Sequence, residues 1–172
     1  MKPQLKDAVI LQQGWPEAGP FADMMRLTYQ RHAAYAMAHG MEYWAVNGFL
    51  KPDLWPGGWG KIWLLRLMLE QGYKHVFWID ADAAIVSDDD LREGLPEGAL
   101  IGACEHYADW FPQYDIPRHY NVGVLFLRND PLTKEFLDDS RHRTGFQGPE
   151  QFCEQQSQEQ YTDTIGDGVP PA

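Results

Sequence analysis

Short apolar runs recur along the chain and predict its strands. These runs cover residues 8–11, 42–46, 75–79, 99–104 and 122–127. The run from His75 to Ile79 is nearly continuous, which is typical of a strand covered on both faces in a parallel sheet. Because helical stretches separate most of these runs, we expect one α/β domain over residues 1–172, with a mostly parallel central sheet flanked by helices.

Four other stretches have helical spacing. They are predicted at residues 21–39, 61–71, 131–143 and 149–156. Gly40 and Gly72 end the first two helices, and the run Asp88–Asp90 is expected to cap a further short helix through Arg92. One face of the first helix is predicted from its apolar and small residues, together with one threonine: Met24, Leu27, Thr28, Ala34, Tyr35 and Ala38.

The charge balance narrows the possible ligands. The chain has 25 acidic and 14 basic residues and a formal charge of −11. General electrostatic attraction therefore does not suit it to nucleic acid or to an anionic membrane, and we expect neither as a partner. A phosphorylated ligand would need a local device such as a metal ion.

The chain shows no signal for secretion or membrane insertion. Its first residues are too polar for a signal peptide, and no run approaches the roughly 20 apolar residues of a membrane span. Cys104 and Cys153 are too few for a disulfide framework and are expected to be free, partly buried thiols. These features predict a cytoplasmic protein, and they leave its oligomeric state open.

Asp80 and Asp82 follow the buried run directly. Alternate side chains of a strand share one side, so both carboxylates are expected to converge just past the end of the strand. Ligands of open α/β sheets bind at this edge, and carboxylate oxygens suit Mn²⁺ or Mg²⁺. Ala81, Ala83 and Ala84 leave room for a ligand. The alternative is a pair of solvated turn carboxylates, because such triplets are common in proteins.

Two further polar positions lie where elements begin. Asn121 precedes an apolar run, and Gly123 permits close backbone approach, so the amide could bind sugar hydroxyls. It could equally satisfy backbone groups of a turn. Glu150 and Gln151 open the last helix, where an acidic residue is also common for purely structural reasons.

Taken together and in this order, these residues resemble the GT-A glycosyltransferases. The resemblance is greatest to the retaining α-galactosyl- and xylosyltransferases and to the glycogenin-like group. It is carried by four stretches: His32–Tyr43, Trp59–Arg66, Trp78–Ala83 and Tyr120–Asn129. It implies a Rossmann-like GT-A domain, a nucleotide-sugar donor (usually a UDP-sugar), Mn²⁺ or Mg²⁺, a hydroxyl acceptor and a retaining outcome.

The resemblance also implies roles for individual residues. Asp80 and Asp82 would hold the metal and the diphosphate, with Asp80 also near the ribose. Asn121 would contact the transferred sugar, and the pair Glu150 and Gln151 would lie beside its anomeric carbon. The residues near the donor would be Leu11, Gln12, Lys61 and Arg66.

The third metal ligand is not assigned. Related enzymes usually complete the site with a late histidine, and no histidine follows His142 in this sequence. Three explanations are open: a minimal enzyme with water at that position, a chain that continues beyond residue 172, and a domain that binds the donor without efficient turnover. Gln12 also stands where the family often has Thr or Ser near uracil, so the base is open as well.

Three other classes of protein share part of this pattern. Phosphatases of the haloacid-dehalogenase type carry Asp-x-Asp after the first strand and continue to a Thr, whereas Ala83 follows here. Sugar nucleotidylyltransferases open with a Gly-rich loop that is absent around residues 11–15. A carbohydrate-binding module would explain Trp55 and Trp59 without a metal.

Overall fold

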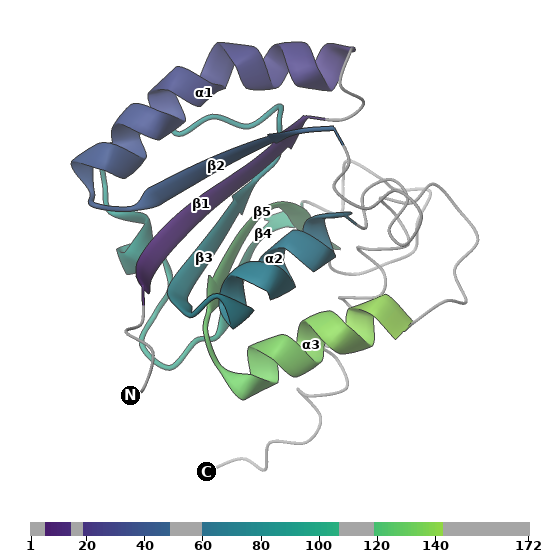
Figure 1. The fold of residues 1–172 in the computed structure, drawn as a ribbon. Coiled ribbons are helices and arrows are strands. Elements are labelled where there is room, and N and C mark those ends of the chain that lie inside the picture. Colours follow the sequence, from purple (N-terminus) through teal and green to yellow (C-terminus); the bar gives the residue numbers. More distant parts are fainter. Residues whose placement is uncertain (1–5, 15–18, 49–59, 107–118, 143–172) are drawn as a thin grey trace.

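The computed structural model describes residues 6–14, 19–48, 60–106 and 119–142, which form a five-stranded sheet with helices on both faces (Figure 1). The strands are β1 (Lys6–Gly14), β2 (Glu42–Asn47), β3 (Tyr73–Ile79), β4 (Ile101–His106) and β5 (His119–Arg128). The helices are α1 (Pro20–Ala38), α2 (Gly60–Glu70), α3 (Pro131–His142) and the short 3₁₀ helix η2 (Leu91–Gly94). The predicted helix at residues 149–156 lies outside the described residues.

The strand order is β2-β1-β3-β5-β4. β1 is parallel to both β2 and β3, which confirms the expected parallel centre of an α/β fold. β5 is antiparallel to both of its neighbours, β3 and β4. The carboxyl ends of β1, β2 and β3 therefore meet at one edge of the sheet, where an open α/β sheet binds its ligands.

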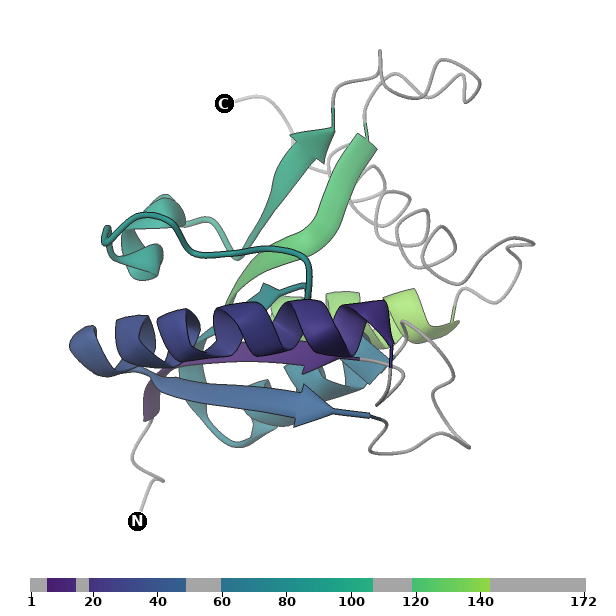
Figure 2. The same cartoon turned by 90° about the horizontal axis from the view of Figure 1, so that it is seen from above.

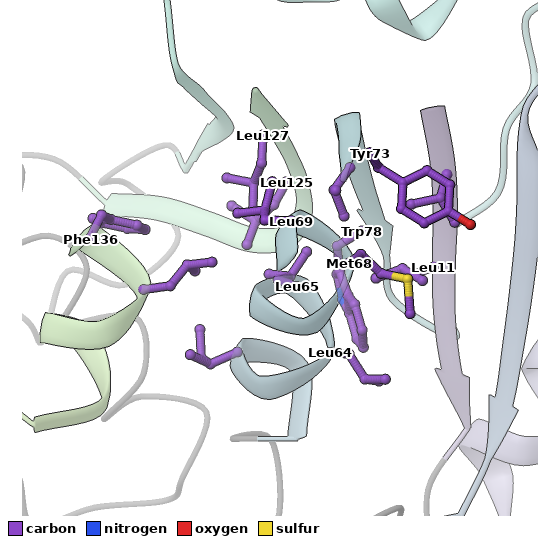
Figure 3. Close-up of a cluster of buried hydrophobic side chains, with 14 of the residues drawn as sticks. Leu11, Leu64, Leu65, Met68, Leu69, Tyr73, Trp78, Leu125, Leu127 and Phe136 are labelled. Carbon is purple, nitrogen blue, oxygen red and sulfur yellow. The ribbon is translucent and has the colours of Figure 1, made fainter. Parts of the chain in front are cut away.

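Two apolar clusters hold the helices against the sheet. α2 and α3 cover one face and pack on the cluster that contains Leu65, Trp78 and Leu125 (Figure 3). α1 covers the other face over β1 and β2 (Figure 1). The cluster there includes Tyr35 and Phe77. Each fully buried leucine in these clusters contributes about 1.5–3 kcal/mol relative to an exposed one.

β3 lies between the two clusters. All four residues from Val76 to Ile79 are buried, and their side chains alternate between the two faces of the sheet. This confirms that the continuous apolar run marks a strand covered on both sides. β1 is longer than its apolar run: it begins at the exposed Lys6 and continues through Gln12, a buried polar side chain that is hydrogen-bonded.

The predicted inner face of α1 is wrong in part. Leu27 is 83% exposed, and Ala34 and Ala38 are exposed as well. The helix turns a different set of residues toward the sheet: Ala22, Met25, His32, Tyr35 and Ala36. The face is displaced because a polar residue, His32, occupies an inward position.

The segment between β3 and β4 carries η2 (Figure 2), and its residues Ile85 and Leu91 pack against the apolar cluster beneath α1. As predicted, Asp90 caps this helix by accepting a hydrogen bond from the backbone N–H of Arg92 at 2.9 Å. The Arg92 guanidinium also pairs with Asp7 and reaches the carbonyl of His39, so it ties η2 to β1 and to the end of α1. The Arg92 guanidinium holds the pKa of Asp90 at about 2.

Two simpler expectations concern the thiols and the membrane. Cys104 is a free thiol, and it is exposed rather than partly buried. Cys153 lies outside the described residues. None of the helices in the described ranges is long and apolar enough to cross a bilayer.

Candidate active site

Asp80 lies immediately after β3, at the edge where the parallel strands end. Its backbone N–H donates to the carbonyl of Gly123 at 2.7 Å, which extends the pairing between β3 and β5 by one residue. Its carbonyl accepts from the N–H of Ala83 at 3.0 Å. The strand thus ends at Ile79 and a turn begins. Strand alternation, the basis for expecting the two carboxylates to converge, does not extend to Asp82.

The carboxylate of Asp80 is held on one side. Its Oδ1 accepts a hydrogen bond from the indole Nε1 of Trp78 at 2.5 Å and lies 3.2 Å from Nζ of Lys61. Its Oδ2 makes no hydrogen bond or ion pair within the described residues. The side chain is 26% exposed, so one carboxylate oxygen is fixed by the protein and the other remains open to a ligand.

Lys61 is a buried cation at the start of α2. Only 5% of the residue is exposed, and its Nζ donates to the carbonyl of Val122 at 2.9 Å. The ammonium also lies 5.3 Å from the centre of the Trp78 ring, within the range of a cation–π contact. A buried charge is tolerated only when it is paired and hydrogen-bonded, and Asp80 and Val122 meet that need.

β5 is irregular where these contacts converge. Its pairing with β4 shifts between Ala103 and Cys104, whose partners on β5 are Leu125 and Asn121. The residues between those partners include Val122 and Gly123, whose carbonyls serve Lys61 and Asp80 instead. Bulges of this kind are common beside functional sites because they redirect backbone groups.

Gly123 permits this close approach. A Cβ atom at this position would lie 2.7 Å from Oδ1 of Asn121 and 3.0 Å from Oδ2 of Asp80. The first distance is too short for a carbon–oxygen contact, so any larger residue would displace one of these side chains. The expected role of Gly123 in close backbone approach is therefore confirmed.

Asp82 and Asp80 are the residues that could hold a metal. Asp82 is exposed, and its carboxylate makes no hydrogen bond or ion pair with the other described residues. Within the described ranges, no three acidic, histidine or cysteine side chains come together around one point. Two carboxylates with one free oxygen on Asp80 nonetheless fit a hard divalent cation, whose remaining ligands would be water and phosphate oxygens. Lys61 balances only one of the two negative charges.

The other predicted donor residues are placed differently. Leu11 is fully buried in the core, and the side chain of Gln12 is also fully buried. Arg66 pairs with Glu70 and Asp138, so it serves the contact between α2 and α3. Gln12 contacts only the backbone carbonyl of Asp80, and within the described residues no hydrogen bond or ion pair joins any of these side chains to the Asp80 carboxylate.

Asn121 lies inside β5, where its Oδ1 accepts from the N–H of Gly123 at 2.6 Å. This is the backbone-satisfying role that was considered as its alternative. Glu150 and Gln151 lie outside the described residues, so their predicted roles remain predictions.

An apolar cavity of about 460 Å³ begins directly after the turn. It lies between the segment 83–94 and β5, with Ile79, Val124 and Phe126 among its lining residues. The walls are mostly hydrocarbon, and their charged lining residues, Asp89, Asp90 and Glu93, are acidic, so the cavity does not suit a diphosphate.

Trp78 lies in one of the stretches that carry the family resemblance, but it was not among the predicted site residues. Trp78 and Asp80 are two positions apart and share one side of the strand, so the period-two rule could have paired them. The carbonyl groups of Val122 and Gly123 carry no signal in the sequence, because every residue has one.

No family model matches the chain, and no curated protein matches its sequence. Among solved structures, the fold is similar to a glycosyltransferase involved in the glycosylation of the major capsid of PBCV-1. The TM-score is 0.65 at 16% identity, and the match covers 95% of this chain and 77% of that one. At this identity the likeness concerns the fold alone. The chain therefore shares its mixed α/β fold with that glycosyltransferase.

Proposed function

We propose that this protein is a metal-dependent glycosyltransferase. It transfers a sugar from a nucleotide-sugar, a UDP-sugar, to a hydroxyl acceptor with retention of configuration at the anomeric carbon. The observation that carries the proposal is the fixed carboxylate of Asp80, next to the buried ammonium of Lys61, at the ligand-binding edge of a glycosyltransferase-like fold.

Charge explains why a metal belongs in this proposal. Asp80 and Asp82 bring two negative charges to one turn, and Lys61 compensates one of them. The chain as a whole is also strongly acidic, at −11. A diphosphate would be repelled from such a site unless a divalent cation came with it. When bound, that cation would supply Lewis-acid stabilisation of the departing diphosphate.

The resemblance to the retaining α-galactosyl-, xylosyl- and glycogenin-like enzymes supports the finer assignments. In the proposal Asp80 and Asp82 hold the cation, and Lys61 orients the Asp80 carboxylate by pairing with it. Asn121 contacts the transferred sugar. Glu150 and Gln151 act beside the anomeric carbon.

A thermal-shift panel tests the proposal. UDP, other nucleoside diphosphates and UDP-sugars are each added with Mn²⁺, with Mg²⁺ or with a chelator. We expect the midpoint of unfolding to rise with UDP or a UDP-sugar only when the metal is present, because a ligand that binds only the native state stabilises it. If no nucleotide or nucleotide-sugar gives a metal-dependent shift, the proposal is wrong.

Two matched variants locate the site within the acidic segment. Asp82→Asn removes a carboxylate from the turn, whereas Asp88→Asn removes an exposed one six positions further along the chain. We expect the first to abolish the metal-dependent shift and the second to retain it. Metal-dependent release of sugar from the donor then separates an enzyme from a domain that only binds the donor.

A further inference from the structure

Gln12 lies at the centre of a buried polar network next to the candidate site. Its Nε2 donates to the carbonyl of Asp80 at 3.2 Å and to the hydroxyl of Thr28 at 3.1 Å. Its Oε1 accepts from the hydroxyl of Tyr43 at 2.7 Å and contacts Nδ1 of His32 at 3.2 Å. A glutamine amide can make two donor and two acceptor bonds, and all four are used here. Gln12 has no capacity left for a ligand.

His32 connects this amide to the far end of the turn. The backbone N–H of Ile85 donates to its Nε2 at 3.1 Å, so Nε2 carries no proton. The proton of the neutral ring is then on Nδ1, which donates to Oε1 of Gln12. Burial lowers the pKa of His32 and favours this neutral form. The ring is fully buried, as is Gln12.

The network therefore holds the turn at both ends. Gln12 binds the carbonyl of Asp80, and His32 binds the N–H of Ile85. Asp82 lies between Asp80 and Ile85, and its side chain makes no hydrogen bond or ion pair with the other described residues. Its position is set by the backbone on either side of it.

We propose that Gln12 and His32 are positioning residues for the turn from Asp80 to Ile85. Together they fix the backbone that carries Asp80 and Asp82 in the geometry that a metal–diphosphate requires. Neither residue touches the ligand. The inference rests on the proposed function, and it replaces the role of donor contact that the sequence suggested for Gln12.

The expected effect on ligand binding is that of residues which hold metal ligands in place without binding the metal themselves. Residues that orient metal ligands typically contribute about 10–100-fold to metal affinity or activity. A network of this kind also contributes to stability, because a buried polar atom that loses its partner is costly. The test must therefore separate binding from stability.

Three variants of the full chain make that separation. His32→Leu removes both hydrogen bonds of the ring. His32→Gln places an amide oxygen where Nε2 lies, so it can still accept from Ile85. Tyr35→Phe is the matched control on the same helix, because the Tyr35 hydroxyl donates to Asp89 at 2.5 Å and accepts from Leu91 at 2.9 Å, beyond the turn.

The probe is UDP with saturating Mn²⁺, measured by titration calorimetry, and stability is measured by urea unfolding. We expect His32→Leu to weaken binding by about tenfold and His32→Gln to restore it to within about threefold of wild type. Tyr35→Phe should lose stability but retain the wild-type affinity. If His32→Leu does not fold, His32→Asn offers the same comparison, because it is too short to reach Ile85.

Two results overturn the inference: wild-type affinity in His32→Leu, or an equal loss of affinity in Tyr35→Phe. If the wild-type protein binds none of the nucleotides and nucleotide-sugars of the thermal-shift panel with either metal, the proposed function fails, and with it the role in ligand binding. Amide hydrogen exchange then still decides whether His32 anchors the turn. Exchange at Ile85 should accelerate in His32→Leu relative to wild type and Tyr35→Phe, and unchanged exchange contradicts the anchoring.

Discussion

The indole of Trp78 donates a hydrogen bond to the carboxylate of Asp80, across a nitrogen–oxygen distance of 2.5 Å. The same ring lies beneath the ammonium of Lys61, which approaches the same carboxylate oxygen. One tryptophan thus contacts both members of an ion pair, while its own side chain is 2% exposed and packed in the core. The core of the fold and the candidate site share this residue.

Trp78→Phe keeps an aromatic ring in the core but removes the donor to Asp80. We expect the free energy of unfolding to fall by about 1–3 kcal/mol, since a hydrogen bond to a charged group is lost and a smaller ring fills the space. Metal-dependent UDP binding should weaken as well. Urea unfolding and calorimetry measure the two effects. Phe77→Leu, on the opposite face of β3, is the control that should change stability alone. Equal affinity for UDP in Trp78→Phe and wild type would contradict the prediction.

Gly123→Ala tests the close approach at the bulge in β5. The added methyl group would lie 2.7 Å from Asn121 and 3.0 Å from Asp80, so we expect the Asp80 carboxylate to move and metal-dependent UDP binding to be lost. Gly102→Ala in β4 is the matched control, because its nearest neighbour would be a flexible Leu95 side chain at 3.1 Å. Calorimetry on both variants gives the comparison. A similar loss of UDP affinity in both variants would show that the close approach of Gly123 to Asp80 is not required for binding.

Lys61→Met leaves the Asp80 carboxylate without its cation. Breaking a buried ion pair costs about 3–5 kcal/mol, and the 26% exposure of Asp80 reduces this, so we expect a loss of about 2–3 kcal/mol. Lys61→Met combined with Asp80→Asn should recover part of that loss, because no unpaired charge remains. A double-mutant cycle by urea unfolding measures the interaction free energy between Lys61 and Asp80. Strictly additive losses of stability would show that the two residues do not interact.

His32 gives the protein a pH dependence with a definite sign. Burial lowers its pKa, with a smaller contribution from Arg31, so the folded state binds this proton less readily than the unfolded chain does. Stability from neutral His32 is therefore complete above the unfolded pKa of about 6.5 and is lost as the pH falls through that value toward the lower folded pKa. His75 also has a lowered pKa, so the difference between wild type and His32→Gln isolates His32. Urea unfolding between pH 8 and pH 5 should show a steeper loss in wild type; parallel curves contradict the assignment.

The core strand and the position of Asp80 beside it were predictable because a buried strand is a continuous run of apolar residues in the sequence. The second half of β3 is a continuous apolar run, because a strand that is covered on both faces buries the side chains on both sides. Asp80 follows it directly, so its place at the sheet edge could be inferred from neighbours in the sequence. The expected α/β fold followed from the same local patterns.

Polar contacts between residues far apart in the chain have no comparable pattern in the sequence. A polar residue in a predicted helix is expected at its surface, whereas His32 is buried. Its partners lie 20 and 53 residues away in the chain. The family resemblance places Gln12 near the donor, whereas in the fold all four hydrogen bonds of its amide go to neighbouring residues of the protein. The strand order was equally hidden, since pairing partners are selected across the sheet and not along the chain.

The position of β5 also bears on how the protein is made. β4 is synthesised before β5, yet among the described strands its only neighbour is β5. The carbonyl groups that hold Lys61 and Asp80 arrive with that same strand. A nascent chain that has not reached His119 therefore has an edge strand with no neighbour and an aspartate whose backbone amide has no acceptor. Translation must pass residue 123 before the site can exist at all.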